Sequence, residues 1–400
     1  MRARPTTAAG SRCAAGAALL LLATLGLGGC AGTSADGTDR AAGTSRPSPT
    51  SPSSGSATAT PSAAGTPRAS AGRPAAVGSS ADPEALEAGR DLLDWSPAPG
   101  SVQDTVTRGR AATLSVDEAG TRARLEAKGA SVTITATPRQ QVSDVLLDDS
   151  WAVVVLQDRQ EQQAASATVV DLRSGRKFTI DGSSAVPTVN GGTWALGAGH
   201  LLHATTDRGA YCVASVDLAT RTAQRGWCAP RRQGFNAARI TPAGDTLLAF
   251  DGGRPVACRT AVRLTGTTVT PAPGVTPCKA WESLALDDGA VWSLIPNEHK
   301  IDESHVYAHS GGSWLDLGPA TAGTLTWCGD AAYFVRDPQR DGSAAALMRW
   351  RPSAGLDGLD VAYESPGGAS FLSAPRCGGD MMTVTAFAQS GDEQVSAPLR

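Results

Sequence analysis

The densest group of side chains able to do chemistry spans residues 297–309, which read Asn-Glu-His-Lys-Ile-Asp-Glu-Ser-His-Val-Tyr-Ala-His. On an extended strand, His305, Tyr307 and His309 would share one face because side chains alternate. Two imidazoles and a loop carboxylate could hold zinc or copper, but the spacing matches no familiar zinc motif. Because removing several charges from water is costly, we expect Asn297 to His309 to form an exposed connection that binds no catalytic metal.

Other reactive residues are more scattered. His200 and His203 flank a turn and the start of a strand, and we expect hydrogen-bonded or surface histidines there. Residues 287–292, Asp-Asp-Gly-Ala-Val-Trp, partly resemble the Asp-box turn of sialidases, but the Ser or Thr before the first Asp is missing. A turn followed by a core tryptophan explains them better. Since no Gly-x-Ser-x-Gly elbow, P-loop or dinucleotide fingerprint appears, the sequence identifies no catalytic residue, no metal ligand and no cofactor.

The elements that would position these residues are short strands. After Val102 the chain alternates brief runs of Val, Leu, Thr and Ala with turn residues. Before it, Asp82 as N-cap and Pro83 as first residue predict a short helix that ends at Leu93. A tight turn then recurs seven times, 40 to 50 residues apart, at Arg108-Gly109, Asp148-Asp149, Ala198-Gly199, Gly244-Asp245, Asp288-Gly289, Gly329-Asp330 and Gly379-Asp380.

This repeat predicts an all-β fold, a single β-propeller of seven four-stranded blades. A second signature, a strand that enters a hairpin, follows in several units, as at Val170–Gly175 and Val262–Gly266. Because the last unit has room for only three strands, the stretch around Leu92–Ser96 is expected to supply the fourth and close the ring. Two stacked β-sandwiches are the alternative. The repeat resembles WD40-like and TolB-like propellers of extracytoplasmic bacterial proteins over about residues 102–400, and this resemblance implies a binding platform.

Six cysteines lie in the predicted propeller, an even number that indicates disulfides. Each pair below occupies matched positions, either around one hairpin turn or before the recurring turn of neighbouring units. We expect the pairs Cys212–Cys228, Cys258–Cys278 and Cys328–Cys377. A metal site is the alternative, but no two of these cysteines have the short spacing of a zinc ribbon.

The N-terminus predicts export and anchoring. Arginines precede a short apolar run that ends in Leu27-Gly28-Gly29-Cys30, and these four residues resemble the bacterial lipobox. We expect a signal peptide over 1–29, lipidation of Cys30 by acyl chains such as palmitate, a disordered tether over 30–82 and the propeller over 83–400. The protein would then lie on the extracytoplasmic face of the cell membrane. The excess of arginine over lysine is typical of GC-rich genomes and indicates an actinobacterium.

Charge narrows the possible partners. The chain carries a formal charge of −3, and its first 82 residues hold seven arginines against three aspartates, which leaves −7 on the rest. An acidic domain disfavours nucleic acid as a partner. The sequence favours a binding or scaffold module that is attached to the membrane by its lipid and whose ligand is a protein, a peptide or a glycan. The alternative is an extracellular propeller enzyme that acts on sugars or cell-wall material.

Overall fold

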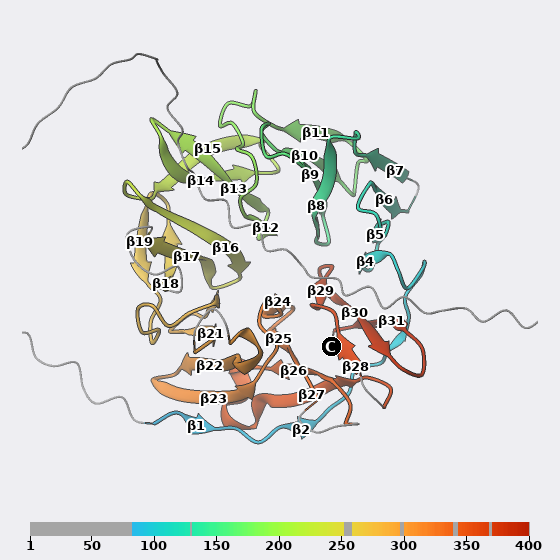
Figure 1. Ribbon diagram of the computed structural model, residues 1–400, viewed down its shortest axis with the longest axis vertical. Helices are drawn as coiled ribbons and strands as arrows, with labels where there is room; N and C mark the ends of the chain where they lie inside the picture. The colour runs from blue at the N-terminus through green and yellow to red at the C-terminus, as the bar shows by residue number, and fades with distance from the viewer. Residues whose placement is uncertain are drawn as a thin grey trace, which may run out of the picture. The chain divides into compact units, whose positions relative to one another are not determined.

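The seven recurring turns correspond to seven β-sheets. A computed structural model describes residues 82–128, 130–251, 258–296, 300–338, 343–367 and 370–399. These residues form seven four-stranded blades in a ring (Figure 1). The predicted fold, an all-β propeller, is therefore confirmed. The predicted signal peptide, Cys30 and nearly all of the predicted tether lie outside the described residues.

Each blade runs from an innermost to an outermost strand. Blade 1 consists of β4 (Thr105–Arg108), β5 (Ala112–Val116), β6 (Arg122–Ala127) and β7 (Ala130–Thr135). Blade 2 consists of β8 (Gln140–Leu147), β9 (Trp151–Asp158), β10 (Ser166–Asp171) and β11 (Lys177–Ile180). Blade 3 consists of β12 (Trp194–Gly197), β13 (His200–Asp207), β14 (Ala210–Asp217) and β15 (Thr222–Cys228).

The next three blades repeat this order. Blade 4 consists of β16 (Gln233–Thr241), β17 (Gly244–Asp251), β18 (Arg259–Thr265) and β19 (Thr268–Pro271). Blade 5 consists of β20 (Glu282–Ala285), β21 (Ala290–Leu294), β22 (His305–Ser310) and β23 (Ser313–Pro319). Blade 6 consists of β24 (Thr326–Cys328), β25 (Ala331–Arg336), β26 (Ala346–Trp350) and β27 (Leu359–Glu364). Two short 3₁₀ helices, η1 (Ile301–Glu303) and η2 (Pro352–Gly358), lie in connections.

Blade 7 is completed by the start of the chain. Its innermost position is divided between β28 (Ser370–Leu372) and β29 (Arg376–Cys377), which both pair with β30 (Met381–Ala388). Next comes β31 (Glu393–Pro398), and β3 (Ser96–Pro97) pairs antiparallel with it as the outermost strand. The expected closure by the N-terminal segment is thus present.

The predicted helix over residues 83–93 is wrong. This segment is extended, and β1 (Glu84–Ala85) and β2 (Gly89–Arg90) add parallel fifth strands to the outer edges of blades 5 and 6. The amide of Leu93 donates to the carbonyl of Ala362 at 3.0 Å, and its side chain, 5% exposed, enters the core between blades 6 and 7. A lone helix of this length is marginal in water, so edge pairing and apolar burial determine the conformation.

The hydrophobic core is divided among the contacts between blades. Six apolar clusters fill the spaces between blades 1 and 2, 2 and 3, 3 and 4, 4 and 5, 5 and 6, and 6 and 7. Between blades 7 and 1 the described residues form no such cluster. Polar contacts join them instead: the Arg108 amide donates to Thr383 Oγ1 at 3.1 Å, and Arg108 Nη1 donates to Ser396 Oγ at 2.8 Å. We call this contact the seam.

Leu93→Ala should destabilise the propeller by about 2–4 kcal/mol, because it leaves a cavity beneath the N-terminal segment. Leu92, its neighbour, is 40% exposed, so Leu92→Ala should change stability by no more than about 0.5 kcal/mol. Urea unfolding of both variants measures the difference. Equal stabilities would show that the segment lies loosely against the blades.

Candidate functional site

The innermost strands of all seven blades line one central channel. Its volume is about 840 Å³, and its lining includes backbone and side chains from β4, β8, β12, β16, β20, β24 and β29. Cavities of this size take small molecules or short polymers. The channel is therefore the candidate site, and the charged side chains within it determine what it can bind.

Six charged residues line the channel. Asp117, Glu118 and Asp148 lie in connections between strands, and three more reach the channel from the innermost strands of three different blades. Asp144 lies on β8, Arg239 on β16 and Arg376 on β29, each a few residues before the turn into the second strand. Because these positions precede equivalent turns, they lie near one end of the channel. None of the three was predicted from the sequence as a site residue.

Arg239 already has partners. Its Nη1 donates to the Ala238 carbonyl at 3.0 Å, and its Nη2 lies 3.8 Å from Glu282 Oε1. Glu282 is 4% exposed and also accepts hydrogen bonds from Ser293 Oγ, Gly323 N and Leu325 N at 2.9–3.2 Å. Burial raises the pKa of Glu282, and Arg239 and these donors oppose the shift. The pair thus joins blades 4 and 5 and the connection into blade 6.

Asp144 and Arg376 differ from this pair. Burial raises the pKa of Asp144, opposed by a hydrogen bond from Ser143 and by the charges of Arg376 and Arg239. Burial lowers the pKa of Arg376, opposed by the charge of Asp144. Each residue thus acts electrostatically on the other, yet no ion pair joins these two described residues. They remain opposite charges on the channel wall.

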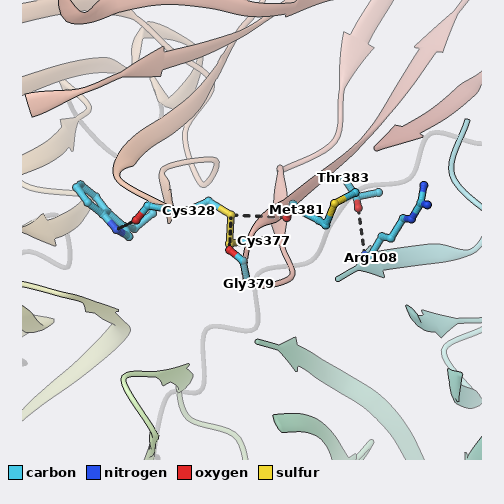
Figure 2. The surroundings of a disulfide bond; sticks show 8 residues. Arg108, Cys328, Cys377, Gly379, Met381 and Thr383 are labelled. Atoms are coloured by element: carbon cyan, nitrogen blue, oxygen red, sulfur yellow. Dashed lines mark hydrogen bonds between the residues drawn. A yellow bond between two sulfur atoms is a disulfide. The ribbon is translucent and has the colours of Figure 1, made fainter. Parts of the chain in front are cut away.

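A disulfide fixes the backbone next to Arg376. Cys328, at the end of β24, is bonded to Cys377, at the end of β29. Figure 2 shows this bridge between blades 6 and 7, with the Cys328 sulfur 3.6 Å from the carbonyl oxygens of Gly379 and Met381. On the other side of Met381 in Figure 2, Thr383 accepts the hydrogen bond from Arg108 across the seam. The bridge therefore holds Arg376 close to the point where the ring closes.

The other two disulfides lie within single blades. Cys212–Cys228 joins the paired strands β14 and β15, and Cys258–Cys278 spans the β18–β19 hairpin. These three bridges are the pairs expected from the repeat. Three disulfides in one chain indicate an extracytoplasmic location. Among the described residues no helix is long and apolar enough to cross a bilayer.

The expected exposed connection over 297–309 is wrong in its second half. His305 to His309 belong to β22, the third strand of blade 5, where Val306 and Ala308 are fully buried because they face the core. His305 Nε2 lies 2.5 Å from Asp316 Oδ1, and His309 packs edge-on against Trp314. Asn297 to His299 lie outside the described residues. No group of three metal-ligating side chains occurs among the residues the structure describes, and the absence of a catalytic metal stays a prediction.

His200 and His203 are both in β13. His200 Nε2 lies 3.1 Å from Asp245 Oδ2 in the neighbouring blade, and this contact raises the pKa of His200. His203 is fully buried; its Nδ1 donates to the Ala204 carbonyl at 2.9 Å, and its ring stacks on Trp194. Asp287 to Gly289 form the turn from β20 to β21, and Trp292 is 3% exposed in the core. Neither histidine lines the channel, and none of residues 287–292 does.

Comparison with known proteins leaves the family open. No family model and no curated sequence matches the chain. Solved structures with a similar fold include the β-propeller domain of the Trilobed protease from Pyrococcus furiosus, with a TM-score of 0.46 and 10% identity over 78% of this chain and 94% of that one. TolB from Acinetobacter baumannii has a TM-score of 0.31 and 13% identity over 74% and 63%. An oligogalacturonate lyase in complex with manganese has a TM-score of 0.37 and 10% identity over 74% and 76%. At these TM-scores and sequence identities, the similarity supports no conclusion about function.

Replacing Cys328 and Cys377 together by alanine should destabilise the propeller by about 4 kcal/mol, because the bridge closes a long loop in the unfolded chain. Replacing Cys212 and Cys228 should cost about 3 kcal/mol, since their loop is shorter. Hydrogen exchange should show that only the first pair of substitutions exposes the amides of β4 and β29. If both pairs open the seam equally, the bridge between blades does not hold it.

Proposed function

We propose that this protein is a lipid-anchored extracytoplasmic binding module whose ligand occupies the central channel. The observation that carries the proposal is the convergence of Asp144 and Arg376 on a channel to which every blade contributes. Both charged side chains are partly desolvated there, and they form no ion pair with each other. Such groups gain free energy when a ligand supplies the missing partners.

The alternative is an extracellular enzyme that acts on sugars or cell-wall material. One observation favours it, namely the raised pKa of Asp144, because a general acid requires a carboxyl group that keeps its proton at higher pH. If the channel is catalytic, Asp144→Asn abolishes turnover of a wall-glycan substrate. A channel that only binds shows no turnover in either form.

Filling the channel should abolish binding. Ala374 lines the channel with an exposed side chain, so Ala374→Trp adds bulk there without disturbing the core. We expect the variant to lose affinity at least about tenfold for any short peptide or glycan fragment that the native protein binds. The matched control is Ala219→Trp, at an exposed hairpin of blade 3. Binding that survives Ala374→Trp would place the ligand elsewhere.

The anchor can be tested in cells. Cys30→Ala removes the thiol that would carry the lipid, so the protein should appear in the medium or accumulate with its signal peptide uncleaved. Membrane and culture fractions are compared by immunoblot, with Cys13→Ala as the control, because Cys13 lies inside the predicted signal peptide. A Cys30→Ala protein that is processed normally and stays in the membrane fraction would refute the anchor.

A further inference from the structure

Arg376 is one of two arginines in the channel lining, and its guanidinium makes no hydrogen bond or ion pair with the described residues. Arg239, by contrast, is in contact with Ala238 and Glu282. Arg376 is partly buried, and burial lowers its pKa, although a guanidinium stays charged at neutral pH. Its five N–H donors form a planar fork that fits a carboxylate.

A second unused donor lies on the neighbouring strand. Thr107 lines the channel and is only 2% exposed, and its buried Oγ1 has no hydrogen-bond partner among the described residues. It belongs to β4, which packs against β29, the strand of Arg376. A guanidinium and a hydroxyl therefore lie on adjoining strands of the channel wall, on either side of the seam.

Asp144 provides the opposite charge. It lies on β8 in blade 2, close enough to Arg376 for their charges to interact, but not in contact with it. An anion alone would meet like charge at Asp144, and a cation alone would meet like charge at Arg376. Only a ligand that carries both charges gives each side chain a partner.

We infer that the channel binds a small zwitterion, an amino acid or short peptide with free termini. Its carboxylate accepts hydrogen bonds from Arg376 and Thr107, and its ammonium group donates to Asp144. The inference rests on the proposed function, since it requires that the ligand occupy the channel. A volume of about 840 Å³ leaves ample room for such a molecule.

The test uses the dipeptide alanyl-alanine as probe, measured by calorimetry on the folded protein. Its N-acetylated form lacks the ammonium group, and its C-terminal amide lacks the carboxylate. We expect the dipeptide to bind and each capped form to bind at least about tenfold more weakly. Arg376→Gln should bind the dipeptide and its amide equally, and Asp144→Asn should bind the dipeptide and its acetylated form equally.

Two controls separate recognition from folding. Arg124→Gln removes an exposed arginine on β6, outside the channel, and should leave binding unchanged. Because the Arg376 guanidinium has no hydrogen bond or ion pair with the described residues to lose, Arg376→Gln without ligand should melt within about 2 °C of the native protein.

The outcomes distinguish the inference from the proposed function. No binding of the dipeptide, equal binding of the capped forms, or discrimination that persists in Arg376→Gln and Asp144→Asn would overturn the zwitterion site. The channel proposal would survive each of these results if Ala374→Trp still blocks another ligand. A dipeptide that binds Ala374→Trp unchanged would overturn both.

Discussion

Closure of the ring at the seam is the constraint on which the rest of this structure depends. Elsewhere, neighbouring blades bury apolar side chains against each other, and that burial supplies the main stabilisation. At the seam the backbones themselves come close. A Cβ on Gly109 would lie 2.9 Å from the Gly378 carbonyl oxygen, and a Cβ on Gly378 would lie 2.2 Å from that of Arg108. Only glycine permits this approach, and Leu147 of blade 2 also reaches Gly378 through an isolated bridge.

The closure of the ring also determines which charged side chains meet in the channel. Asp144 and Arg376 belong to blades that are far apart in the sequence but lie on either side of blade 1 in the ring. Their charges act on one another only because the seam brings blades 7, 1 and 2 together. Cys328–Cys377 lies immediately beside Arg376, so the same covalent bond supports both the joint and the candidate site. The stability of the ring and the candidate site therefore depend on the same residues in this part of the fold.

Local patterns in the sequence were enough to predict the blades and the cysteine pairs. Each blade has its own turn between the first and second strands. Cysteines that flank one hairpin, or that precede this turn in neighbouring blades, must lie on paired or neighbouring strands. Prediction failed where a distant partner determined the outcome. The helix signals from Asp82 to Leu93 are real, but the open edges of blades 5 and 6 offer this segment better pairing. Similarly, the polar character of His305 and His309 concealed an alternating strand whose other face is core.

The channel charges could not be predicted because convergence is a property of the closed ring. A signal does exist: Asp144, Arg239 and Arg376 each interrupt an innermost strand just before the recurring turn. That signal becomes meaningful only once those strands are known to surround a channel.

The position of β3 has a consequence for how the chain folds. Ser96 pairs with Ser396. Ser96 is among the first residues of the propeller to be synthesised, and this pairing can form only after nearly the whole propeller has been made. Contacts of such long range are slow to form, and until then blade 7 has an open edge that invites wrong pairing. The disulfides join residues only 16, 20 and 49 positions apart, so all three can form on a chain whose ring is still open. The blades can therefore mature one after another as the chain emerges, while completion of the ring remains a single late event that loss of even the final strand would prevent.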